Sequence, residues 1–396
     1  MSDPLQNPVK TNVCMTFFLD FYFDGAHSLI PRVKRHLSDM QRFFDEITIL
    51  TLDNRNFTKI FEGTKVMHRP LLPLQAPHLA RGLLGSLVGL KELVSIVRSE
   101  KDIIFFSSPY ALYSVLVSRI LKIPLIIHFK YDPTTQPSMN FRHRIKRGIL
   151  NALINLALRS ADMIVVTTPH VKRMVISRKV PAEKVFVSPN YVDEALFSSS
   201  VDGKSIRERF SIVRHEKLIM YLGRLSHEKG LSTLIEAFSI LCSRLQNIKL
   251  AIVGGGPERG VLQKKCQILG LADKVLFINP VSHMLVPNFL AASDVVVLPS
   301  YSEGHPKILI EAMIMSKPLV ATDVIGIQDV VENRKDAILV KPGDAKELAE
   351  ALQMLIENDN RARTIAYNAK RKALTEYSKK AVFKLAERNP FLILGF

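Results

Sequence analysis

Short apolar runs rich in β-branched residues recur along the whole chain, separated by stretches of helical character. Six lie in the first half and six in the second: 13–20, 46–53, 102–108, 124–129, 162–168, 184–190, 218–223, 249–255, 274–278, 294–300, 317–323 and 337–340. Unbroken apolar runs are typical of strands covered on both faces, and strand–helix alternation is typical of right-handed parallel crossover units. The pattern predicts an α/β fold with two doubly wound parallel sheets, each a Rossmann-like domain.

The length of the chain agrees with two domains. Its 396 residues suffice for about two domains with separate cores. A polar stretch of small residues, SSSVDGKS at 198–205, lies between the two series of runs. We therefore expect one domain over 1–200, a second over 201–375 and a tail over 376–396. The tail ends in PFLILGF, which should dock on the protein, and the N-terminal domain is one place for it.

Composition excludes several classes of protein. The three cysteines, Cys14, Cys242 and Cys266, have neither metal-ligand nor disulfide-framework spacing, which indicates a reducing compartment and no metal site. The N-terminus shows no secretory signal, and the longest apolar stretch, 103–127, is interrupted by charged residues. We therefore expect a cytoplasmic protein without a membrane span.

The charge balance points to an anionic partner. The formal net charge is +17, which fits nucleic acid, an anionic membrane face or a phosphorylated substrate, and also a merely basic solvated surface. Nucleic acid is disfavoured because the sequence contains no reading motif with interleaved aromatic residues. The stretch 77–100 has apolar residues at helical spacing, which predicts either a core-covering helix or an amphipathic helix at lipid headgroups. A basic cluster over 142–147 keeps peripheral association with the cytoplasmic face of a membrane among the hypotheses.

A glycine turn with two cations follows the first apolar run of the second half. The segment 219–230 reads IMYLGRLSHEKG, so Gly223 closes the run and is followed by Arg224 and Lys229. At the carboxyl end of a parallel strand, glycine lets backbone N–H groups approach a phosphate closely. Gly255, in a GGGP turn, has the same position after the next run. Because arginine and lysine together suit a diphosphate, the segment predicts a diphosphate site, whereas the two cations alone would indicate only a surface loop.

Two carboxylates flank a helix start further along. The segment SYSEGHPKILIEAM places Glu303 before a glycine and Glu311 eight residues later, with Pro306 suited to the first helical position. The backbone at this helix start would bind an anion or a hydroxyl group. It consists of His305, Pro306, Lys307 and Ile308. We predict that Glu303 accepts hydrogen bonds from a transferred sugar and Glu311 from a ribose, as a nucleotide-activated sugar requires. Taken alone, Glu311 would be an exposed helix glutamate.

Two residues of the first half join the candidate site. His128 ends the apolar run PLIIH, at the carboxyl end of a predicted buried strand, where it would face the crevice. Gly25 follows the first run and would admit a phosphate from the first-domain side.

These motifs together resemble those of the family 4 glycosyltransferases. The resemblance implies the GT-B fold, in which two Rossmann-like domains face a central cleft. The resemblance is carried by GRLSHEKG, VGGGP, DVVVLPS and SEGHPKILIEA with its Glu-x7-Glu spacing, and by PLIIH and VPAEKVFVSPNYVDEALF in the first half. It spans nearly the whole chain. The sequence departs from the family pattern in the single Gly25, where many members have paired glycines, in Phe129 after His128, and in the end ERNPFLILGF.

The resemblance implies a role for each motif. Arg224 and Lys229 would bind the donor diphosphate with Gly25 opposite, Glu303 the donor sugar and Glu311 the ribose, while His128 would lie beside the anomeric centre. The family retains anomeric configuration, needs no metal or other cofactor, and lets the leaving phosphate receive the proton of the acceptor.

The leading hypothesis is a retaining hexosyltransferase. It would move a hexose-type sugar from a UDP- or GDP-linked donor to a lipid-linked or saccharide acceptor. The alternatives are a sugar-nucleotide epimerase or a phosphorylase of the same fold, and a catalytically silent scaffold subunit. The Glu-x7-Glu segment argues against the first two, and the intact Arg224, Lys229, Glu303 and Glu311 argue against the scaffold.

Overall fold

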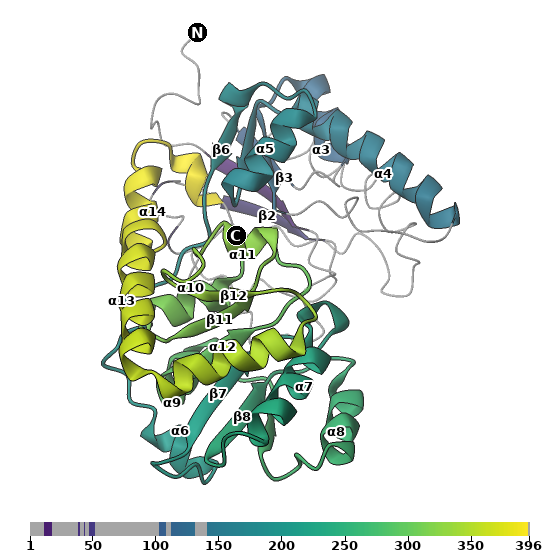
Figure 1. Ribbon diagram of the computed structural model, residues 1–396. Coiled ribbons are helices and arrows are strands. Elements are labelled where there is room, and N and C mark those ends of the chain that lie inside the picture. Colours follow the sequence, from purple (N-terminus) through teal and green to yellow (C-terminus); the bar gives the residue numbers. More distant parts are fainter. Residues whose placement is uncertain are drawn as a thin grey trace. The chain divides into compact units, whose positions relative to one another are not determined.

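The computed structural model describes residues 12–17, 39, 43, 47–51, 103–107, 112–130 and 141–394, and divides the chain into two compact units (Figure 1). The first unit comprises Met1–Pro189 together with Lys384–Phe396, and the second comprises Asn190–Phe383. The division therefore falls at Pro189, before the polar stretch 198–205 at which the sequence places the boundary.

The described strands of the first unit form a parallel sheet in the order β2-β1-β3-β4-β5-β6. Their bounds are β1 Asn12–Phe17, β2 Ile47–Thr51, β3 Ile103–Ser107, β4 Leu125–Phe129, β5 Met163–Val166 and β6 Val185–Val187. The described helical segments of this unit are α3 Leu112–Leu121, α4 Phe141–Ser160, α5 Pro169–Ser177, the 3-10 turn η5 Ala182–Lys184 and, near the end of the chain, η8 Pro390–Leu394. Every residue of β4 is buried, as expected for a strand covered on both faces.

The second unit contains a parallel sheet in the order β12-β11-β10-β7-β8-β9. Its strands are β7 Lys217–Leu222, β8 Ile248–Val253, β9 Val275–Ile278, β10 Val295–Leu298, β11 Leu319–Thr322 and β12 Ile338–Val340. Its helices are α6 Lys204–Arg209, α7 Leu231–Cys242, α8 Arg259–Ile268, α9 Val286–Ala292, α10 Lys307–Ile314, α11 Ile325–Gln328, α12 Ala345–Glu357 and α13 Asp359–Glu376, with 3-10 turns η6 His227–Lys229 and η7 His283–Leu285. Helix α14, Lys379–Ala386, crosses the division between the units.

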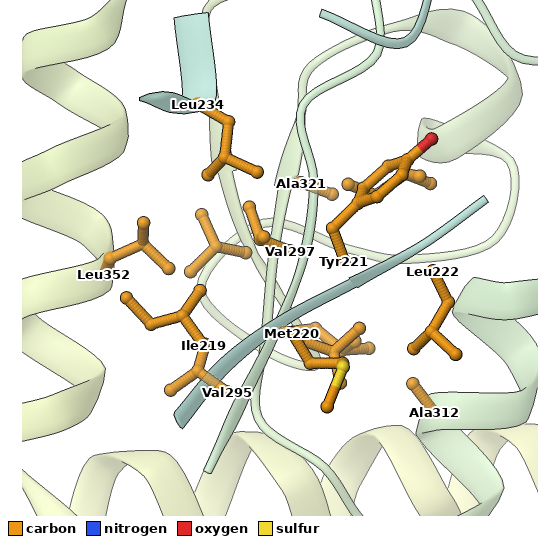
Figure 2. Packing of buried hydrophobic residues seen from close by; sticks show 14 of the residues in the cluster. Ile219, Met220, Tyr221, Leu222, Leu234, Val295, Val297, Ala312, Ala321 and Leu352 are labelled. Carbon is orange, nitrogen blue, oxygen red and sulfur yellow. The ribbon is translucent and has the colours of Figure 1, made fainter. Parts of the chain in front are cut away.

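The core of the second unit is built around β7. Successive side chains of a strand point to opposite faces, and in Figure 2 Ile219 lies on the side of Leu352 from α12, while Met220 and Leu222 lie on the side of Ala312 from α10. Residues 218–222 are at most 6% exposed. Both faces of the sheet are thus apolar, which is why these strands appear in the sequence as unbroken apolar runs.

The structure confirms the predicted fold class and each of the twelve predicted strands. The apolar end of the chain docks as expected. Phe391 and Leu392 are buried, and Ser188 of the same unit donates a hydrogen bond to the Leu392 carbonyl. The stretch 77–100 lies outside the described residues, and the basic cluster 142–147 lies within α4.

Candidate active site

The strand order of the second unit determines where a ligand crevice can form. From β7 the chain passes through β8 to β9 on one side, and then returns to β10 on the other side of β7. In open parallel sheets, ligands bind outside the carboxyl ends of the strands at such a switch point. The turns that follow β7 and β10 carry the two sequence motifs with charged residues, so both motifs meet at this edge of the sheet.

Backbone hydrogen bonds join the glycine turns after β7 and β8. The Gly223 amide donates to the Val253 carbonyl at 3.0 Å, and the Leu225 amide donates to the Gly255 carbonyl at 2.9 Å. A Cβ atom at Gly254 would lie 1.8 Å from the Gly223 carbonyl oxygen, so any side chain there would force the two turns apart. The glycines therefore bring backbone close to backbone at the switch point.

Lys229 and Glu303 form an ion pair across the switch point. The Lys229 Nζ donates to Glu303 Oε1 at 2.8 Å, and the two side chains are 22% and 9% exposed. The hydroxyl group of Ser300, just after β10, donates to the same oxygen at 2.7 Å. The hydrogen bonds of the described residues thus reach the Glu303 carboxylate through Oε1 alone, which leaves Oε2 to accept a hydrogen bond from a ligand.

Arg224 and a second carboxylate, Glu228, lie beside this pair. The Arg224 side chain is exposed, and Tyr221 donates to its backbone carbonyl at 2.8 Å. Burial works to raise the pKa of Glu228, but a hydrogen bond from Ser226, a backbone N–H and the charges of Lys229 and Arg224 together lower it. Burial raises the pKa of Tyr221, and Glu303 and Glu228 raise it further. Lys229 thus contacts Glu303 directly, and Arg224 and Glu228 belong to the same short turn as Lys229.

The loop between Glu303 and α10 is held by its buried histidine. The His305 side chain is 9% exposed and its ring makes an edge contact with Tyr377 at 5.6 Å between centroids. The His305 carbonyl accepts a hydrogen bond from Asn190 at 2.8 Å. Because the ring is directed into the protein, only the backbone of His305 can take part in ligand binding.

Helix α10 begins one residue later than the sequence predicted. Pro306 occupies the N-cap position, and its ψ of 110° is extended and not helical. Its carbonyl accepts from the Leu309 amide at 3.2 Å, which closes the first turn. The helix therefore starts at Lys307, with Ile308 in the first turn, and the helix N-terminus lies directly after the loop that carries Glu303.

Glu311 is buried and paired, so the interpretation as an exposed helix glutamate is wrong. It is 5% exposed, and its Oε1 lies 2.8 Å from Nε2 of His283, which belongs to the segment after β9. Burial of a carboxylate requires such a partner. Among the described residues, side-chain hydrogen bonding to this carboxylate again involves Oε1 only.

The two first-unit candidates have different outcomes. His128 lies in β4, paired in register with Val165, and is 8% exposed. It occupies the last position but one of that strand, at the carboxyl end as predicted. Gly25 lies outside the described residues. Within the part of the chain that the structure describes, no group of three or more His, Cys, Asp or Glu residues could hold a metal ion, and no helix is long and apolar enough to span a membrane.

Several residues of the cluster escaped the sequence analysis. Ser300 and Glu228 lie inside the quoted motifs DVVVLPS and GRLSHEKG, so their proximity to charged residues was a usable signal. His283 lies in no motif. It follows β9 and Glu311 lies in the helix after β10, and these two strands are separated in the sheet by β7 and β8, so the pairing of His283 with Glu311 depends on the strand order.

In the comparison with known proteins, both halves of the chain match glycosyltransferase family models. A family model described as Glycosyl transferases group 1 matches residues 202–372, and one described as Glycosyltransferase Family 4 matches residues 33–196. An alpha-D-kanosaminyltransferase of Streptomyces kanamyceticus is 30% identical over 277 residues, which are 69% of this chain and 71% of that protein. The chain belongs to the family 4 glycosyltransferases.

Further relatives and solved structures agree with this membership. The capsular polysaccharide biosynthesis glycosyltransferase CapM of Staphylococcus aureus is 25% identical over 383 residues, covering 94% of this chain and 97% of CapM. The crystal structure of Anabaena HepE in complex with UDP and glucose superposes with a TM-score of 0.75 at 22% identity, covering 95% of this glycosyltransferase and 98% of HepE. WaaG, a glycosyltransferase involved in lipopolysaccharide biosynthesis, superposes with a TM-score of 0.74 at 18% identity, with coverages of 95% and 98%. At these identities the two structures establish the GT-B fold.

Proposed function

We propose that this glycosyltransferase moves a hexose-type sugar from a nucleoside-diphosphate donor, UDP- or GDP-linked, with retention of anomeric configuration. The observation that carries the proposal is the Lys229–Glu303 pair at the switch point of the second sheet. It combines a cation for phosphate with a carboxylate for hydroxyl groups in contact with each other. A nucleotide sugar has the matching groups: hydroxyl groups on one side of the bond between sugar and diphosphate, and phosphate oxygens on the other.

The cations provide for the diphosphate. Lysine has three N–H donors, so Lys229 can keep its bond to Glu303 and also donate to a phosphate oxygen. Arg224 is exposed and can offer a planar fork to two phosphate oxygens. The Gly223 amide is engaged by the Val253 carbonyl, so we propose that backbone N–H groups reach the phosphates from Gly255 and from the helix start at Lys307 and Ile308. HepE, with the same fold, was crystallised with UDP-glucose, which supports a nucleotide-sugar donor.

In the proposed reaction the leaving diphosphate carries developing negative charge, which Arg224 and Lys229 stabilise without a metal ion. Glu303 orients the transferred sugar through Oε2, and Glu311 binds the ribose. We propose that His128 takes part in the sugar transfer and Gly25 in phosphate binding, as the resemblance to the family implies. The acceptor hydroxyl gives its proton to the leaving phosphate oxygen, so positioning and electrostatics provide most of the rate enhancement.

For the acceptor we propose a lipid-linked or saccharide hydroxyl. CapM is named for capsular polysaccharide biosynthesis and WaaG for lipopolysaccharide biosynthesis, which supports a saccharide or lipid-linked acceptor. The net charge of +17 fits work at the anionic cytoplasmic face of a membrane.

The test is a pair of substitutions with matched controls. Glu303→Gln and Lys229→Met should each lower kcat by about 10²–10³-fold, the size of effect seen when one preorganised electrostatic contact is removed. The controls are Glu236→Gln and Lys265→Met, which break an ion pair of the same type between α7 and α8. The assay follows release of UDP or GDP from a panel of nucleotide sugars, with thermal unfolding of every variant.

Full activity in the two site variants would refute the proposed donor site. Absence of a thermal shift of the wild-type protein with UDP or GDP would favour the scaffold alternative.

A further inference from the structure

The carboxylate of Glu311 is bound by His283, a residue that lies outside the sequence motifs. His283 and Glu311 come from segments 28 residues apart, the turn after β9 and helix α10, and their Nε2 and Oε1 atoms are 2.8 Å apart. Both side chains are largely shielded, at 22% and 7% exposed. A hydrogen bond in this setting is protected from competition by water and restricts both groups.

His283 is itself held in place by its surroundings. Its ring packs against Phe197, which is 1% exposed, with 5.3 Å between ring centroids. The preceding residue, Ser282, caps the turn η7 by accepting a hydrogen bond from the Met284 amide at 3.4 Å. The imidazole therefore presents Nε2 to Glu311 from a fixed position and not from a freely rotating loop.

Glu311 is bound in the same way as Glu303, through one carboxylate oxygen. Lys229 and Ser300 hold Glu303 through Oε1, and His283 holds Glu311 through Oε1. A carboxylate with one oxygen bound by the protein can rotate little, so its second oxygen has a defined direction before the ligand arrives. Binding is then stronger because less conformational freedom is lost.

We infer that His283 is a positioning residue of this glycosyltransferase: by binding Oε1 it orients Glu311 so that Oε2 accepts a hydrogen bond from the ribose 2′-hydroxyl of the donor. The inference rests on the proposed donor site. It assigns part of the selectivity for ribonucleotides to a residue that does not itself contact the ligand.

Two substitutions separate the hydrogen bond from the packing. His283→Leu keeps an apolar group against Phe197 and removes the donor, whereas His283→Gln keeps an amide N–H that can reach Glu311. His215→Leu, at an exposed position of the same unit, is the matched control. Dissociation constants are measured by calorimetry on the full chain for UDP, GDP and their 2′-deoxy analogues.

The wild type should bind the ribonucleotide of its preferred base more tightly than the 2′-deoxy form. His283→Leu should weaken ribonucleotide binding about tenfold, the effect of one hydrogen bond to a charged group, and should bring the two forms close to equal affinity. His283→Gln should restore most of the preference. In turnover, His283→Leu should raise KM for the donor with little change in kcat, because ribose contacts are the same in ground and transition states.

The outcomes separate the inference from the proposed function. If His283→Leu folds and retains the wild-type preference for ribose, the inference is wrong and the donor site stands. A wild type that binds a ribonucleotide without preference over the 2′-deoxy form also overturns it. If the wild type binds neither UDP nor GDP, the proposed function fails and the inference fails with it. Should His283→Leu unfold, a His283→Gln variant that binds both forms equally would contradict the inference by itself.

Discussion

The buried ring of His305, in the loop between Glu303 and α10, makes the free energy of unfolding depend on pH. Burial, with a smaller contribution from the Lys307 charge, lowers the pKa of His305 from 6.5 to about 3. The folded protein therefore keeps this imidazole neutral across the physiological range, whereas the unfolded chain takes up a proton once the pH falls below about 6.5. Because the folded pKa is the lower of the two, stability is intact above about pH 6.5 and is lost as the pH falls towards 3.

The size of the loss follows from the pKa difference. Each pH unit below the unfolded pKa contributes about 1.4 kcal/mol until the folded pKa is reached. Between pH 7 and pH 5 this single group should lower the free energy of unfolding by about 2 kcal/mol. That is a large fraction of the stability of an ordinary domain.

The perturbation that isolates this effect is His305→Phe. Phenylalanine keeps an aromatic ring against Tyr377 and binds no proton. We expect the difference in unfolding free energy between wild type and variant to change by about 2 kcal/mol from pH 7 to pH 5, in favour of the variant at low pH. The measurement is urea unfolding at several pH values, with His215→Phe, at an exposed position, as control. Parallel pH profiles for wild type and His305→Phe would refute the reasoning.

Two further predictions concern the turns around the site. A Cβ at Gly254 would lie 1.8 Å from a backbone carbonyl oxygen, while one at Gly260 in α8 would meet nothing within 4 Å. Gly254→Ala should therefore destabilise the protein severely, and Gly260→Ala should be neutral or stabilising by up to about 1 kcal/mol, as thermal unfolding will show. Ser300→Ala removes one of the two donors to Glu303 Oε1 and should lower kcat/KM about tenfold. The buried Ser293→Ala, whose hydroxyl donates only to the helix before it, should leave kcat/KM unchanged.

Most of the fold could be predicted because strands that are buried on both faces of a sheet appear in the sequence as unbroken apolar runs. A strand such as β7 has no solvent face, so KLIMYL contains no alternation, and the same holds for LVAT of β11. The boundary between the units was harder to predict from the sequence. Asn190 and Tyr191 precede the polar stretch, but their contacts with His305 and Phe383 assign them to the second unit. Such contacts join residues more than a hundred positions apart and leave no local pattern.

The candidate site was predictable to the extent that topology alone brings residues together. Lys229 and Glu303 are 74 residues apart, and only the adjacency of β7 and β10 makes them neighbours. Side-chain direction was not predictable. Nothing local to the sequence indicates that the ring of His305 is directed inward onto Tyr377, or that Glu311 is buried on the face of α10 that meets His283.

The supports of the two carboxylates come from three different turns of one sheet. Lys229 follows β7, Ser300 follows β10 and His283 follows β9, so each carboxylate keeps its direction only while the carboxyl ends of these strands stay in register. The glycine turns after β7 and β8 are joined by backbone hydrogen bonds, and the β8 turn connects to β9 through the Gly254 amide and the Ile278 carbonyl at 3.0 Å. The same close backbone packing that requires glycine therefore also fixes the distance between Lys229 and His283, which support the proposed sugar-binding and ribose-binding carboxylates. A substitution that widens these turns should consequently weaken donor binding even where every charged residue is intact.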